Sequence, residues 1–181
     1  DGPQRRRAQP PPLRRPQGLP QRGLCAGGRD GMQRITLLCV GKLKERFYAE
    51  AAAEYAKRLS RYCKLEMVEL PEERLPENPA PAQIDAALEK EAEAIRRKIP
   101  PSSRVIALCV EGRLRSSEEL ARTMAAWAAG AEHGLEKRLV FLIGGSFGLH
   151  EAIKAEAWGK LSMSPMTFPH HLARVMLLEQ I

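Results

Sequence analysis

Short apolar runs alternate along this chain with segments whose apolar residues recur at helical spacing. Buried strands are predicted by three runs: 34–40 (RITLLCV), 104–110 (RVIALCV) and 139–143 (LVFLI). Two further strands are predicted over 64–70 and 158–163. Helices are predicted over 45–62, 83–98, 116 to about 132, 149–157 and 170–181. Strands separated by helices predict an α/β fold, with a mostly parallel sheet flanked by helices.

The sequence also marks where several of these elements begin and end. Four prolines between residues 71 and 81 predict a loop, and Pro100 with Pro101 ends the helix before them. Ser116 and Glu119 have the spacing of a capping box, which predicts a helix start.

Parallel sheets bind ligands in the loops that follow the carboxyl ends of their strands. Three such loops are predicted at 111–115, 144–148 and 164–169. The second, GGSFG, lets the backbone turn sharply and lets a ligand approach its amides. By itself this glycine pattern indicates a tight strand-to-helix turn about as well as a binding site. It has neither the G-x-G-x-x-G spacing nor a P-loop lysine.

The third loop holds a Met-Thr-Phe run between Pro165 and Pro169. Apolar side chains beside free backbone groups suit an adenine ring and a thioether, although such a run can also simply close a core. In the first loop, Arg113 can hold a phosphate or can be a solvated surface charge. His170 and His171 are adjacent at a predicted helix start, so they point about 100° apart and would not bind one metal together.

Composition restricts the class of protein. The chain has 181 residues, which is typical of one domain, and 44% of them are hydrophobic. No apolar run approaches the roughly 20 residues of a membrane helix. The four cysteines form no C-x-x-C pair, so we expect free thiols and no metal site. We therefore expect a soluble, cytoplasmic protein.

Positive charge is concentrated in the first 31 residues. The net charge of the chain is +7, and residues 1–31 hold seven arginines against two aspartates. Six prolines and six glycines in the same segment cannot form a core, so we expect a disordered tail that is upstream or non-native sequence. The alternative is a basic arm that contacts phosphates. Residues 32–181 are expected to form one folded domain.

Four segments together resemble a known family: MQRITLLCVGKLKERF, VIALCVEGRLRSSEELA, LIGGSFGLHEAI and LSMSPMTFPHHLARVMLLEQI. The family is ribosomal RNA large subunit methyltransferase H, which belongs to the SPOUT superfamily of knotted methyltransferases. The resemblance covers Met32 to Ile181. It implies a homodimer with a C-terminal trefoil knot, S-adenosylmethionine as methyl donor, and no metal. It also implies methylation of N3 of a pseudouridine in 23S rRNA on the ribosome.

The resemblance assigns roles to particular residues. The implied donor contacts are Leu108, Gly144, Met163, Ser164, Pro165, Met166, Thr167 and Phe168. His170 or His171 is expected to assist proton removal, and Arg113 or Arg174 to hold RNA phosphate. The family continues into a Tyr-Arg helix and a Pro-Tyr-His tail, whereas this sequence stops at Ile181, so we expect a truncated copy.

Two alternative functions remain at this point. One is a ribosome- or RNA-binding protein that binds the cofactor but is catalytically impaired by loss of the tail. The other is a nucleotide-binding oxidoreductase, which rests on the glycine turn and lacks the expected fingerprint after the first strand.

Overall fold

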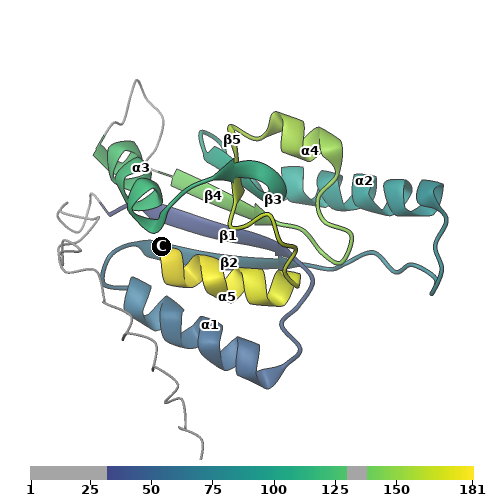
Figure 1. Cartoon of the computed structure of the whole chain (residues 1–181), viewed down its shortest axis with the longest axis horizontal. Coiled ribbons are helices and arrows are strands. Elements are labelled where there is room, and N and C mark those ends of the chain that lie inside the picture. Colours follow the sequence, from purple (N-terminus) through teal and green to yellow (C-terminus); the bar gives the residue numbers. More distant parts are fainter. Residues whose placement is uncertain (1–31, 130–137) are drawn as a thin grey trace, which may run out of the picture.

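A five-stranded sheet runs through the part of the chain that the structure describes, residues 32–129 and 138–181 (Figure 1). In this computed structural model all neighbouring strands pair in parallel, in the order β2-β1-β4-β3-β5. The strands are β1 (Arg34–Val40), β2 (Lys64–Leu70), β3 (Arg104–Leu114), β4 (Arg138–Ile143) and β5 (Gly159–Ser162). The predicted α/β fold with a parallel sheet is therefore confirmed.

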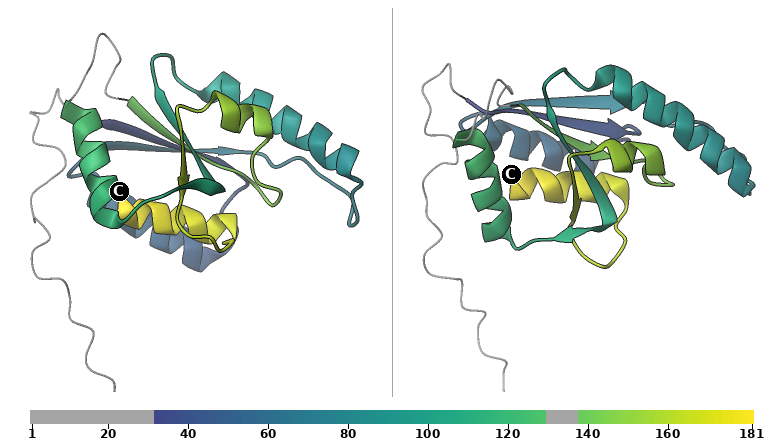
Figure 2. Two further views of the ribbon diagram at one scale, coloured as in Figure 1. Left: turned by 45° about the horizontal axis from the view of Figure 1, so that its top comes forward. Right: turned by 90° about the horizontal axis from the view of Figure 1, so that it is seen from above.

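Helices cover both faces of the sheet (Figures 1 and 2). One face packs against α1 (Arg46–Leu59), α3 (Ser117–Ala129) and α5 (His170–Gln180). The other packs against α2 (Pro81–Lys98) and α4 (Glu151–Glu156). Because both faces are covered, β4 is apolar at successive positions rather than at every second one.

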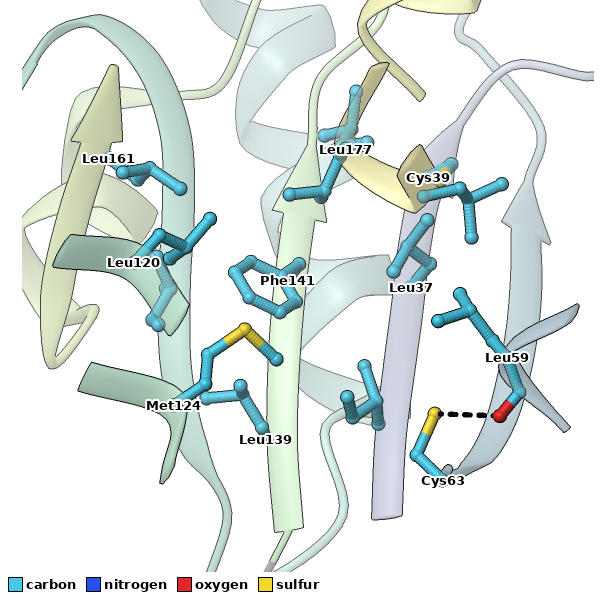
Figure 3. Close-up of a cluster of buried hydrophobic side chains, with 14 of the residues drawn as sticks. Leu37, Cys39, Leu59, Cys63, Leu120, Met124, Leu139, Phe141, Leu161 and Leu177 are labelled. Atoms are coloured by element: carbon cyan, nitrogen blue, oxygen red, sulfur yellow. Dashed lines mark hydrogen bonds between the residues drawn. The ribbon is translucent and has the colours of Figure 1, made fainter. Parts of the chain in front are cut away.

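The larger core lies between the sheet and the α1, α3 and α5 layer (Figure 3). Phe141 of β4 is fully buried there, beside Met124 of α3 and Leu177 of α5. Cys39 lies in the same cluster, and burial raises the pKa of its thiol to about 12. This cysteine is a small core residue, as its apolar surroundings in the sequence predict.

The predicted bounds of β1 and β2 are confirmed, but β3 is longer than predicted. It continues to Leu114 through the segment expected to be a loop, because its last residues pair with β5 beyond an irregularity. Gly112 allows this approach, since a Cβ there would lie 2.5 Å from the carbonyl carbon of Leu161. The first of the three predicted loops, 111–115, is therefore strand as far as Leu114.

Helix bounds differ by a few residues from the predictions. The α2 helix begins at Pro81, a favoured first position for proline because its missing N–H needs no partner there. The α4 helix begins at Glu151, after an extended His150 whose Nδ1 accepts a hydrogen bond from the amide of Ala152. The capping box is confirmed by reciprocal bonds between Ser116 and Glu119.

Some predictions fall outside what the structure tests. The tail 1–31 and the end of the third predicted helix, residues 130–132, lie outside the described residues. The trefoil knot stays a prediction. Within the described ranges, no helix combines the length and the apolar character needed to cross a bilayer.

Candidate functional site

A cavity of about 910 Å³ opens at the carboxyl edge of the sheet. Its walls come from the end of β3, the turn after β4, the loop after β5 and the starts of α4 and α5. Of the residues predicted to contact a donor, seven line it: Leu108, Gly144, Met163, Ser164, Met166, Thr167 and Phe168. Pro165 is not among the lining residues. The fold thus brings most of the predicted contacts to one place.

Glycines shape the turn after β4. A Cβ on Gly144 would lie 2.2 Å from the carbonyl carbon of Gly148, so no larger residue fits without moving the backbone. Gly148 has a φ of +82°, in the left-handed region that favours glycine. The turn therefore needs both glycines, and their missing side chains leave main chain open to the cavity.

The loop after β5 is held by its own serines. The Ser162 hydroxyl donates to the Ser164 carbonyl at 2.9 Å, and the Met166 amide donates to Ser164 Oγ at 3.1 Å. Met166 is 69% exposed and Phe147, across the cavity in the glycine turn, is 48% exposed. Large apolar side chains at the mouth of a cavity suit a ligand with an apolar part.

Glu72, in the loop after β2, holds the glycine turn in place, although it belongs to none of the three predicted binding loops. Its Oε1 accepts a hydrogen bond from the Ser146 amide at 2.6 Å. Burial works to raise the pKa of Glu72, but this bond and the nearby His170 and His171 outweigh it and lower that pKa. Sequence reasoning missed Glu72 because its proline-rich surroundings predict only a loop.

His170 lines the cavity at the start of α5, and its Nε2 is buried without a hydrogen-bond partner among the described residues. A Cβ built on Gly41 would lie 3.1 Å from that Nε2 and 3.8 Å from Glu72 Oε2, so the two side chains are neighbours. Burial and then His171 lower the pKa of His170, although Glu72 opposes them. The lowered pKa favours the neutral form of the imidazole at pH 7.

His171 does not share this position. It is not among the cavity-lining residues, and its Nδ1 lies 3.5 Å from Glu45 Oε2 at the start of α1. Its ring centroid is 6.0 Å from that of Tyr48. Of the two histidines expected to assist proton removal, His170 lines the cavity and His171 does not, and the catalytic role stays a prediction.

The structure places the two arginines expected to hold phosphate differently: Arg174 is buried and Arg113 is exposed, and the phosphate contact of Arg113 stays a prediction. Arg174 is 1% exposed, and its Nη2 donates to the Gly41 carbonyl at 3.0 Å while Nη1 pairs with Glu69. A buried, paired guanidinium is not available to RNA. Arg113 is exposed but lies in β3, paired in register with Leu161, and it does not line the cavity.

Lys154 of α4 is a buried cation that lines the cavity, and sequence patterns did not predict its role there. Lys154 is 8% exposed and its Nζ pairs with Glu111 and Glu151. Burial works to lower the pKa of Lys154, but the two carboxylates outweigh it and raise that pKa. Burial and Glu111 raise the pKa of Cys109 beside it, which disfavours the reactive thiolate form.

Comparison with known proteins identifies a family to which the sequence is similar. The sequence model of a family described as predicted SPOUT methyltransferase matches residues 32–181. A solved structure of a putative TrmH-family RNA methyltransferase from Porphyromonas gingivalis is 12% identical, with a TM-score of 0.39, covering 82% of this chain and 59% of that one. The SpoU methyltransferase AviRb from Streptomyces viridochromogenes, solved with AdoMet, is 12% identical, with a TM-score of 0.40 and coverages of 82% and 57%. This chain spans less than two thirds of the length of either protein.

Proposed function

The chain belongs to the SPOUT methyltransferase family, and on this premise we propose that it transfers a methyl group from S-adenosylmethionine to RNA. The proposed target is N3 of a pseudouridine in 23S rRNA, and the proposed active form is a homodimer in the cytoplasm. One observation carries the proposal. The glycine turn after β4 and the Met-Thr-Phe loop after β5, far apart in sequence, line one cavity with Leu108.

The cavity fits the methyl donor in size and chemistry. Its volume of about 910 Å³ lies in the range of small-molecule sites. The turn at Gly144 exposes main chain that can hydrogen-bond polar groups, while Met166 and Phe168 offer apolar surface to an adenine ring. Bound there, S-adenosylmethionine supplies a methyl carbon that its sulfonium already activates.

The protein's remaining tasks are alignment and proton removal. Pseudouridine N3 is an imide nitrogen, which must lose its proton as its electron pair forms the new bond to the methyl carbon. The C–S bond breaks at the same time and leaves S-adenosylhomocysteine. We assign the proton to the imidazole of His170, because this side chain lines the cavity and its pKa lies below the usual value.

Glu72 is the positioning residue in this scheme. Its carboxylate lies beside His170 and fixes the Ser146 amide, so it links the proton acceptor to the glycine turn. It also stabilises the imidazolium that forms when His170 takes the proton. Glu72 itself is held outside the turn and is not assigned a contact with the methyl donor.

The test is methyl transfer to ribosomes that lack the modification. Incubation with donor labelled in the methyl group, followed by mass mapping of RNA fragments, identifies the modified nucleotide. We expect one added methyl group on a 23S pseudouridine, and loss of incorporation with His170→Ala. Incorporation into another nucleotide would overturn the specificity, and no transfer by a chain that binds the donor would overturn the catalytic assignment.

A further inference from the structure

Basic side chains line the amino edge of the sheet, opposite the edge that holds the cavity. In the strand register, Arg34 of β1 pairs with Lys64 of β2 on one side and with Arg138 of β4 on the other. Arg104, the first residue of β3, pairs with Leu139, the residue after Arg138. Four adjacent parallel strands therefore each begin with a cation. Arg34, Lys64 and Arg138 are in register, about 4.8 Å apart from strand to strand, whereas Arg104 is offset by one residue and points to the other face of the sheet.

Much of this charge is available to a partner. Arg34 and Lys64 are exposed, and neither has an ion pair with a carboxylate in ranges 32–129 and 138–181. Exposed arginines on the helices differ, because Arg46 and Arg58 each pair with a glutamate four residues away. Glu66, which follows on β2, reduces the charge of the row without cancelling it.

Aromatic side chains stand at both ends of the row of cations. Trp158, just before β5, is 59% exposed and packs edge-on against Trp127 of α3, with ring centroids 5.1 Å apart. The Arg104 guanidinium carbon lies 4.6 Å from the centre of the Trp158 ring. Tyr62, two residues before Lys64, is 47% exposed at the other end. Exposed rings beside cations are the pattern that binds unpaired bases together with phosphates.

We propose that this amino edge is a second RNA-binding surface, with Arg34, Lys64 and Arg104 as phosphate contacts and Tyr62 and Trp158 as stacking platforms. Naming RNA rests on the proposed function. A seven-residue strand such as β1 is about 23 Å long, so one RNA stem passing along the sheet can reach both the cavity and this edge.

The first test reverses charge on the full chain. We compare Arg34→Glu/Lys64→Glu with a control, Lys90→Glu/Arg122→Glu, which changes the net charge equally on exposed positions of α2 and α3. Binding of a fluorescein-labelled RNA hairpin is followed by anisotropy over a series of KCl concentrations. The edge variant should bind roughly tenfold or more weakly, and the slope of log affinity against log salt should fall by about 1.5 to 2.

Equal losses in the edge variant and the control would overturn the proposal, because they would show an effect of net charge alone. Unchanged affinity and slope in the edge variant would overturn it as well. Tighter binding to phosphatidylserine vesicles than to the hairpin at the same salt would assign the edge to a membrane surface instead. The neutral variant Arg34→Gln/Lys64→Gln keeps the test valid if the charge reversal lowers stability.

The second test separates stacking from charge. Trp158→Ala should weaken hairpin binding roughly tenfold with an unchanged salt slope, whereas Trp158→Phe should restore most of the affinity. Failure of Phe to restore binding would contradict a stacking role. Calorimetric titration with S-adenosylhomocysteine accompanies every variant, because the edge variants should keep wild-type affinity for it. If the wild-type chain binds the hairpin through this edge but binds no S-adenosylhomocysteine, the proposed function fails and the RNA surface stands.

Discussion

The guanidinium of Arg174 in α5 is bound to the carboxylate of Glu69 at the end of β2. A second nitrogen of the same guanidinium donates to the carbonyl of Gly41 after β1, at 3.0 Å. These contacts hold α5 at the ends of two strands. His170 lies one helical turn before Arg174, so the same ion pair fixes the position of the proposed proton acceptor.

Removing one partner of this pair should cost stability. The Arg174 side chain is 2% exposed and that of Glu69 is 36% exposed, so Glu69→Gln leaves a buried charge with a weaker partner. We expect a loss of about 2–3 kcal/mol in the free energy of unfolding, measured by urea denaturation. The control is Glu50→Gln, which breaks the exposed Arg46–Glu50 pair and should cost less than about 0.5 kcal/mol. Equal costs for the two variants would contradict the structural role of Arg174.

The capping box at the start of α3 gives a second prediction. Ser116→Ala removes the oxygen that accepts from the Glu119 amide and should destabilise the protein by about 1 kcal/mol. Ser117→Ala serves as the control, because that hydroxyl donates to Gln180 on the surface and caps no amide of α3. Thermal unfolding of the two variants checks this, and a larger loss for Ser117→Ala would show that the cap has been misassigned.

The pH dependence of methyl transfer tests the pairing of Glu72 with His170. The base must be neutral, so activity falls as pH drops through the pKa of His170, which lies below its usual value of about 6.5. Glu72 raises that pKa, so Glu72→Gln should move the acidic limb of the pH–rate profile to still lower pH. The amide oxygen of glutamine can still accept from Ser146, which preserves the turn.

Glu73→Gln is the matched control, since Glu73 is the next residue and its side chain pairs with Lys90 on the surface. It should leave the acidic limb where the wild type has it. An acidic limb that stays in place or moves to higher pH in Glu72→Gln would contradict the assignment of His170 as the base.

The sequence predicts strands well where the signal is local. The apolar runs of β1 and β4 are covered by helices on both faces, so hydrophobicity alone marks them. The polar end of β3 has no such signal. Its extended form comes from pairing with β5, which lies about 50 residues later and reaches β3 because Gly112 has no side chain.

Some residues of the candidate site can likewise be predicted from local sequence, and others cannot. Gly144 and the loop from Met163 to Phe168 can be predicted, because a strand followed by glycines or bracketing prolines marks a loop at the carboxyl edge. Glu72 and Lys154 cannot be predicted, since their roles depend on contacts with Ser146 and Glu111 that are 74 and 43 residues away. The burial of Arg174 cannot be predicted either, because a helix face that contains a cation looks solvent-exposed in the sequence.

The most direct test of the donor cavity is calorimetric titration of S-adenosylhomocysteine into wild type, Gly144→Ala and Gly159→Ala. A Cβ at Gly144 would lie 2.2 Å from the Gly148 carbonyl and must displace the turn, whereas a Cβ at Gly159 meets nothing within 4 Å. We predict binding to wild type and to Gly159→Ala, and a loss of at least about tenfold in affinity for Gly144→Ala, equivalent to about 1.4 kcal/mol. Undiminished binding to Gly144→Ala, or no binding to folded wild type, would contradict the assignment of this cavity to the methyl donor.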